Sequence, residues 1–147
     1  MNNGKKIIIG SDHAGFEMKH SIISNLSDIE FNDIGTDSDE SVDYPDYAHN
    51  VVKGILSNSY SFGVLICGTG IGMSMSANRT KDIRAALCLN TNIRQRANPP
   101  ASINACAFSI TLCHNTFLLY KWLVSSNPSI LNTTWVGNGK GFKHLAS

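Results

Sequence analysis

Short apolar runs alternate along the chain with longer stretches in which apolar positions recur at helical spacing. A short continuous apolar run is typical of a buried strand, whereas a stripe that repeats every three to four residues is typical of a helix. The predicted strands are residues 5–10, 30–34, 62–66, 84–88 and 105–112. The predicted helices are residues 16–26, 46–56, 71–78, 90–96 and 117–124. Because strands alternate with helices within one domain, the chain predicts a parallel α/β sandwich with right-handed crossovers.

Polar residues flank the first two predicted helices. We expect Lys19 and His20 to point outward from the first helix, whose apolar stripe faces the sheet. Ser11 or Asp12 is expected to cap its N-terminus. Tyr44 precedes a proline, which favours an extended backbone, so this side chain could reach over a neighbouring crevice.

Composition narrows the classes of partner and compartment. The chain has 147 residues and a net charge of +1, which fits one domain with a real core. It has no basic run, so we expect neither nucleic acid nor an anionic membrane as a partner. No apolar stretch reaches membrane-spanning length, and we expect no signal peptide. The cysteines at 67, 88, 106 and 113 lack CxxC spacing, so we expect reduced thiols in a cytoplasmic protein.

The loop over residues 35–45 is acidic and rich in turn-forming residues. Its four carboxylates, from Asp37, Asp39, Glu40 and Asp43, could suggest a metal site. Their spacing fits no EF-hand pattern, and a solvated loop is the better interpretation. We therefore expect no metal and no cofactor.

The stretch over residues 62–76 carries the most chemistry. An apolar run ends at Cys67, and Gly68, Gly70 and Gly72 follow before a helix that begins near residue 71. Glycines permit positive φ and a close approach to the backbone, and the N–H groups of a helix N-terminus attract anions. Such a terminus also favours a thiolate over a thiol. The pattern predicts a site for a small phosphorylated substrate; the alternative is a tight turn beside a buried, inert cysteine.

A second polar pair, Asp12 and His13, follows the first predicted strand and precedes the first helix. Binding residues concentrate in loops at strand ends of such folds. The alternative is that Asp12 is only a cap and that His13 is only a loop residue.

Together these motifs resemble the ribose-5-phosphate isomerase B family, which also contains the galactose-6-phosphate isomerase subunits. The matching segments are GSDHAGFEMK (10–19), DIGT (33–36), DYPDYA (43–48), GVLICGTGIGMSMSAN (63–78) and IRAALC (83–88). We treat 1–147 as one domain whose match is clear for 5–88 and poor for 89–147. The resemblance implies a Rossmann-like three-layer sandwich with a five-stranded parallel sheet. It also implies an active site at the interface of a homodimer or a dimer of dimers.

The resemblance assigns roles to residues of the glycine loop in an aldose–ketose isomerisation of a sugar phosphate through an enediolate. Cys67 matches the base in one branch of the family, and Met73 stands where the other branch has a glutamate. Thr69 matches a hydroxyl that assists at the substrate oxygens. The backbone N–H groups of Gly70, Ile71 and Gly72 match the anion hole for the enediolate. Asp12 and His13 match the pair that touches the sugar oxygens and the phosphate. The resemblance also assigns substrate contacts to Gly68 and, as lesser contacts, to Tyr44 and Asn78.

The chain departs from the family pattern after residue 88. The family's ring-opening histidine falls on 100–101, its next arginine falls near Thr111, and no arginine follows Arg96. The chain is then a diverged, weakened or inactive member, or residues after 88 come from a displaced reading frame, or other groups substitute. The candidate substitutes are Arg94, Arg96, His114, Asn115, Lys140 and Lys143. Two function classes stay open: an isomerase of pentose or hexose phosphates, and a non-catalytic subunit that binds sugar phosphates.

Overall fold

The computed structural model describes residues 6–27, 29–57, 59–60, 62–88, 104–109, 134–137 and 142–145. The elements are β1 (Ile7–Ser11), α1 (Phe16–Asn25), β2 (Phe31–Asp33), α2 (Tyr44–Leu56), β3 (Phe62–Cys67), α3 (Ile71–Asn78), β4 (Ala85–Cys88), β5 (Ala105–Ser109), β6 (Thr134–Gly137) and β7 (Phe142–Leu145). The predicted helices 90–96 and 117–124, and the end of the fifth predicted strand, lie outside the described residues. No helix in the described part of the chain is both long and apolar enough to cross a membrane.

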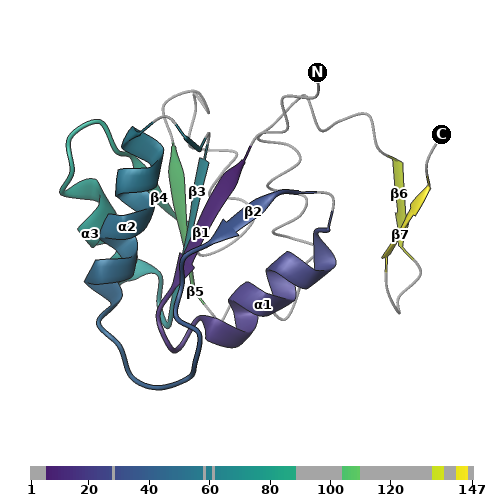
Figure 1. The fold of residues 1–147 in the computed structure, drawn as a ribbon, viewed down its shortest axis with the longest axis horizontal. Coiled ribbons are helices and arrows are strands. Elements are labelled where there is room, and N and C mark those ends of the chain that lie inside the picture. The colour runs from purple at the N-terminus through teal and green to yellow at the C-terminus, as the bar shows by residue number, and fades with distance from the viewer. Residues whose placement is uncertain are drawn as a thin grey trace.

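A five-stranded parallel sheet forms the centre of the fold, in the order β2-β1-β3-β5-β4 (Figure 1). This confirms the predicted α/β class. β3 lies between β1 and β5, with Ser11 opposite Ile66 and Cys67 opposite Ser109. The antiparallel pair β6–β7 was not predicted from the sequence.

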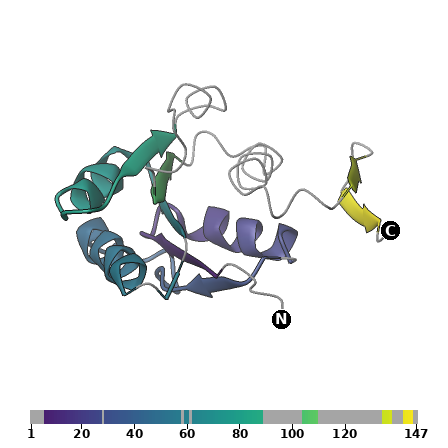
Figure 2. The same ribbon diagram turned by 90° about the horizontal axis from the view of Figure 1, so that it is seen from above.

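Helices cover both faces of the sheet, as Figures 1 and 2 show, with α1 on one face and α2 and α3 on the other. Successive strand residues point to opposite faces, so Ile7 and Ile9 pack in the core beneath α1 while Ile8 packs beneath α2. By the same alternation, Ile66 faces α1, and Cys67 belongs to the core beneath α2 and α3. The predicted three-layer arrangement is confirmed, and it places the Cys67 side chain on the face that carries α3.

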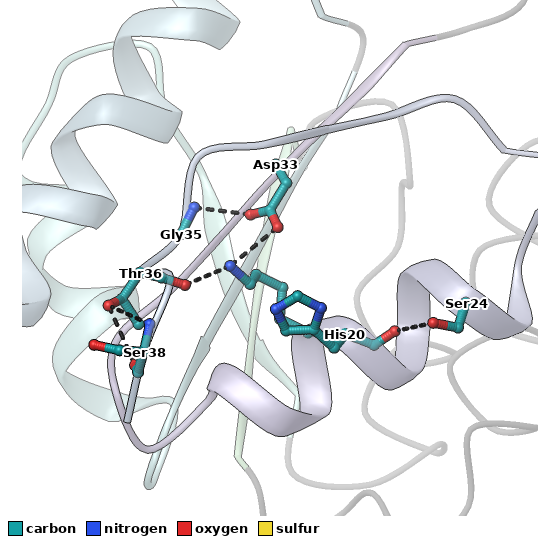
Figure 3. Close-up of polar contacts among 7 residues, drawn as sticks. His20, Ser24, Asp33, Gly35, Thr36 and Ser38 are labelled. Atoms are coloured by element: carbon teal, nitrogen blue, oxygen red, sulfur yellow. Dashed lines mark hydrogen bonds and ion pairs between the residues drawn. The ribbon is translucent and has the colours of Figure 1, made fainter. Parts of the chain in front are cut away.

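The expectation that Lys19 points outward is wrong, whereas His20 is exposed as predicted. The Lys19 side chain is fully buried, and its amine lies 3.0 Å from Asp33 Oδ2 and donates to the Thr36 carbonyl at 2.6 Å. Figure 3 shows Asp33 and Thr36 on the two sides of this amine, with Gly35 donating to the same carboxylate. A buried ammonium is tolerated here because it is paired with a carboxylate and donates a hydrogen bond to a carbonyl. The contact ties α1 to the loop that follows β2.

The starts of α1 and α2 differ from the predictions. α2 begins at Tyr44, so this residue lies in the first helical turn rather than in an extended segment before it. The following proline fits there because the first N–H groups of a helix have no intrahelical acceptor. α1 has Gly15 at its N-cap and no side-chain cap, so neither Ser11 nor Asp12 caps it in the predicted way. Asp12 instead accepts the N–H of Gly15 through Oδ1 at 3.0 Å, one residue before the helix.

Candidate active site

The candidate site lies where the carboxyl ends of β1 and β3 meet. The chain runs from β1 to β2 on one side and returns to β3 on the other, which makes this the switch point where ligands bind in open α/β sheets. Asp12 follows β1 directly, and its N–H donates to the carbonyl of Ile66 in β3 at 3.2 Å. The structure therefore brings the Asp12–His13 pair next to Cys67 and the glycine loop.

Cys67 closes β3 and is nearly buried, with 5% of its surface exposed. Its Sγ accepts the backbone N–H of Gly70 at 3.1 Å. Gly70 reaches that position with φ of +75°, a left-handed conformation that disfavours any residue with a Cβ. The loop therefore turns back so that one of its own backbone N–H groups donates to the Cys67 sulfur.

Gly72 is required by the closeness of Tyr44. A Cβ added at Gly72 would lie 2.8 Å from Tyr44 Cε2 and 2.9 Å from Cζ. The ring of Tyr44 thus packs against the first turn of α3, while its role as a substrate contact stays a prediction. Gly68 shows no such constraint, since its added Cβ would meet only the Cβ of Ala14, at 3.9 Å.

The loop's backbone donors divide into two groups. The N–H of Gly70 is held by Cys67 Sγ, and the N–H of Ile71 donates to Thr69 Oγ1 at 3.3 Å. Within the part of the chain that the structure describes, the N–H groups of Thr69 and Gly72 have no acceptor. Of the three donors that the resemblance named for the anion hole, those of Gly70 and Ile71 are thus held within the loop, whereas that of Gly72 is open, as is that of Thr69.

Asp12 is buried, with 6% exposed, and burial raises the pKa of its carboxyl. The N–H groups of Gly15 and Ala14 and the neighbouring His13 oppose that rise. A carboxyl group in this setting can exchange a proton with a substrate hydroxyl more readily than an ordinary aspartate at neutral pH.

The tautomer of His13 follows from its backbone contact. His13 Nδ1 accepts the N–H of Val42 at 3.2 Å, from the end of the acidic loop. An N–H can only donate, so Nδ1 carries a lone pair and the ring proton of the neutral imidazole lies on Nε2. His13 therefore presents a donor on its other edge, which suits an oxygen ligand. The acidic side chains of that loop are themselves exposed, as predicted for a solvated loop: Asp37, Asp39, Glu40 and Asp43.

The structure does not bring Asn78 together with the other predicted site residues. Its amide donates to the carbonyls of Ser74 and Ala85, and its Oδ1 accepts the N–H of Ala85. Ala85 is the first residue of β4. The register of β4 and β3 on β5 places it at the same height in the sheet as Gly63, near the start of β3. Cys67 lies at the other end of β3, about 13 Å away at 3.3 Å per residue.

Ser109 is a residue that the sequence reasoning missed. It closes β5 opposite Cys67, is 3% exposed, and its hydroxyl donates to the carbonyl of Gly68 at 3.0 Å. The sequence pattern placed Ser109 inside a strand predicted to run to residue 112 and gave no reason to single it out. Its position opposite Cys67 depends on the pairing of β3 with β5, which the sequence pattern does not give.

Comparison with known proteins shows that this chain is similar to sugar-phosphate isomerases. A family model described as ribose/galactose isomerase matches residues 7–118. A provisionally named sugar phosphate isomerase of Rickettsia bellii is 48% identical over 93 residues, which are 62% of this chain and 65% of that protein. The chain thus covers a little less than two thirds of that relative. Ribose-5-phosphate isomerase B of Escherichia coli is 41% identical over 106 residues, 71% of each chain.

A solved structure shows the same likeness. The crystal structure of a ribose 5-phosphate isomerase of Thermotoga maritima superposes with a TM-score of 0.74 at 44% identity. The superposition covers 92% of this chain and 91% of that one. At this identity the match supports common ancestry as well as a common fold.

Proposed function

Because the chain belongs to the ribose/galactose isomerase family, we propose that it interconverts ribose 5-phosphate and ribulose 5-phosphate through an enediolate. One observation carries the proposal. Cys67 Sγ is held by the Gly70 N–H at the carboxyl end of β3, beside the buried carboxyl of Asp12 and two unused N–H donors of the described loop. This combination supplies a base, a second proton-exchanging group and donors for negative charge.

In the proposed reaction the Cys67 thiolate removes the proton from C2 of the open-chain aldose. The C–H electrons form the C1–C2 double bond, and the carbonyl electrons move onto O1, which gives the enediolate. The thiol then returns its proton to C1 while O2 becomes the ketone oxygen. The hydroxyl proton that leaves O2 reaches O1 through Asp12 or the Thr69 hydroxyl. Atoms and charge balance without a cofactor, as expected for an isomerisation.

The loop donors act on the charge that develops in this reaction. The N–H groups of Thr69 and Gly72 can donate to the enediolate oxygen, and donors aimed at a developing charge are worth about 10²–10³ in rate each. Thr69 Oγ1 accepts the Ile71 N–H, and the hydroxyl keeps its own proton to donate to a substrate oxygen. His13 donates through Nε2 to a sugar or phosphate oxygen.

Phosphate binding is the weak point of the proposed site. In the described region around the loop, His13 is the candidate side-chain donor, and its single Nε2–H lacks both the charge and the two-pronged fork with which arginine binds a phosphate. The candidate substitutes Arg94, Arg96, His114, Asn115 and Lys140 lie outside the described residues, and Lys143 lies in β7. A charge-assisted hydrogen bond to the phosphate is worth about 1.5–3 kcal/mol, and the absence of such bonds weakens binding by that amount each. We therefore expect a raised KM for ribose 5-phosphate.

The test is steady-state kinetics on the purified protein with ribose 5-phosphate, for the wild type and Cys67→Ala. We expect slow but measurable turnover, with the defect mainly in KM, and loss of turnover in C67A. The matched control is Cys106→Ala, which removes a buried thiol on the opposite face of the sheet. Substantial turnover in C67A would exclude Cys67 as the base.

A second function is favoured by the missing arginines. A non-catalytic subunit would bind sugar phosphates without turning them over and would depend on a partner for the absent groups. A galactose-6-phosphate isomerase subunit is the related possibility in the same family. No turnover by the wild type at any ribose 5-phosphate concentration, with binding retained in calorimetry, would favour this class.

We also propose that the chain forms a homodimer, or a dimer of dimers, through the surface beside the site. Tyr44, Ile71 and Met75 are large apolar side chains that are 40%, 48% and 61% exposed on the adjoining turns of α2 and α3. Met75→Lys should shift the sedimentation coefficient toward the monomer. Leu56→Lys is the control, since Leu56 is 45% exposed but lies about 18 Å along α2 from Tyr44. We place the assembly in the cytosol, because Cys67 and Cys88 are free thiols.

A further inference from the structure

The Ser109 side chain links the end of β5 to the glycine loop. Ser109 donates its hydroxyl proton to the carbonyl of Gly68 at 3.0 Å. Ala105 and Ala107 of the same strand lie in the core beneath α2 and α3, as Cys67 does. Side chains alternate along a strand, so Ser109 points to that face too, directly beside Cys67, its register partner.

The contact sets the direction of one peptide group. In a trans peptide the C=O of one residue and the N–H of the next point in opposite directions. The carbonyl of Gly68 points toward Ser109 on β5, so the N–H of Thr69 points to the other side of β3. That side holds β1, whose end carries Asp12 and His13. Among the described residues this N–H has no acceptor, so it is available to a ligand.

We propose that Ser109 is a positioning residue that keeps the Gly68–Thr69 peptide turned so that the Thr69 N–H faces the site as an anion donor. The need for such a restraint follows from the sequence of the loop. A Cβ added at Gly68 would meet nothing closer than the Ala14 Cβ, at 3.9 Å, and a glycine without close neighbours can change its dihedral angles at little steric cost. A turned peptide would place the carbonyl oxygen where negative charge develops and would remove one donor.

The same restraint reaches the sulfur of Cys67. Thr69 is followed by Gly70, whose N–H is the donor to Cys67 Sγ at 3.1 Å. A peptide turned at 68–69 changes the path of the chain into Gly70 and weakens that bond. Ser109 therefore supports both the anion donor and the proposed base without touching the substrate.

The test compares Ser109→Ala with Ser74→Ala. Ser74 is the matched control, because it is also a buried serine whose hydroxyl donates to a backbone carbonyl, that of Ala85 at 3.2 Å. The hydrogen bond of Ser74 lies at the amino ends of the strands, whereas that of Ser109 lies at their carboxyl ends. We expect losses of thermal stability of the same order in the two variants, since each loses a hydroxyl-to-carbonyl bond and Ser74→Ala also loses the 3.4 Å bond that its hydroxyl accepts from Asn78 Nδ2. Ser109→Thr keeps the hydroxyl and should restore what Ser109→Ala loses.

The kinetic readout rests on the proposed function. For an interaction made mainly in the transition state, kcat falls while KM stays nearly constant. We expect kcat of S109A to fall about 10- to 100-fold, up to the effect of deleting an anion donor. S74A should keep the kcat and KM of the wild type.

The second readout does not depend on catalysis. The amide NMR signals of Thr69 and Gly70 should broaden in S109A, because the peptide then exchanges on the microsecond-to-millisecond timescale, and should stay sharp in S74A. If the wild type shows no turnover, the proposed isomerase function fails while this readout still tests Ser109. Equal behaviour of S109A and S74A in the NMR spectra overturns the positioning role.

Discussion

Lys19 provides the sharpest test of the structure, because a lysine on a predicted outward face is found fully buried. The perturbation is Lys19→Met, which keeps an apolar stem of similar length and removes the ammonium group. The amine's two partners differ in exposure: Thr36 is 5% exposed, and the Asp33 side chain is 31% exposed. The more buried partner, Thr36, is therefore expected to contribute most to the loss in the free energy of unfolding.

The expected loss follows from the two orphaned acceptors. The Thr36 carbonyl loses its donor in a buried setting, which costs about 1–3 kcal/mol. Breaking a fully buried ion pair costs about 3–5 kcal/mol, but the Asp33 carboxylate can turn toward water, so that figure is an upper bound. We expect a net loss of about 2 kcal/mol in the free energy of unfolding. For a chain of this size that corresponds to a fall of roughly 7 °C in Tm.

The assay is urea and thermal unfolding of Lys19→Met beside His20→Met at pH 7. His20 is the adjacent helix position and is exposed, so its replacement should change the free energy of unfolding by no more than about 0.5 kcal/mol. Adding Asp33→Asn to K19M should recover part of the loss, because the unpaired carboxylate is then removed. If K19M is as stable as H20M, Lys19 does not bind Asp33 and Thr36 in solution, and the reasoning fails.

Three further predictions concern the site and its support. Burial raises the pKa of Asp12, so its contribution to stability is present below the ordinary carboxyl pKa of about 3.9 and is lost as the pH rises through the raised value. Asp12→Asn should therefore be more stable than the wild type at pH 7, while its kcat falls. In urea titrations the difference in the free energy of unfolding should shrink toward pH 4. A difference that does not change with pH would contradict this. Gly70→Ala places a Cβ on a residue with φ of +75°, so it should lower the free energy of unfolding by about 1–2 kcal/mol, measured by thermal unfolding. Steady-state kinetics should show the loss of most of the activity. Asn78→Ala removes the hydrogen bonds to Ser74 and Ala85, so it should lower the free energy of unfolding by about 2 kcal/mol and leave KM unchanged. A raised KM at unchanged stability would instead support the substrate contact that the resemblance implied.

The local pattern of residues was sufficient to predict the α/β class and the strand, glycine turn and helix over residues 62–78. The apolar run that ends at Cys67 can only be a buried strand, and a glycine-rich turn into a helix must present N–H groups at its end. The positive φ of Gly70 and the helix start at Ile71 follow from the same local chemistry. Residues 62–78 therefore carried their own structural and chemical signal.

The tertiary structure decided the features that depend on residues distant in the chain. Lys19 looked like a surface lysine because helical spacing does not show that Asp33 and Thr36 lie opposite it. Asn78 matched a family motif, yet it lies at the end of α3 beside Ala85, at the amino ends of the strands. Ser109 became visible only when the order β1-β3-β5 set it beside the glycine loop. A pattern along the chain specifies the nature of each element, whereas contacts between elements depend on strand order and register, which no single segment encodes.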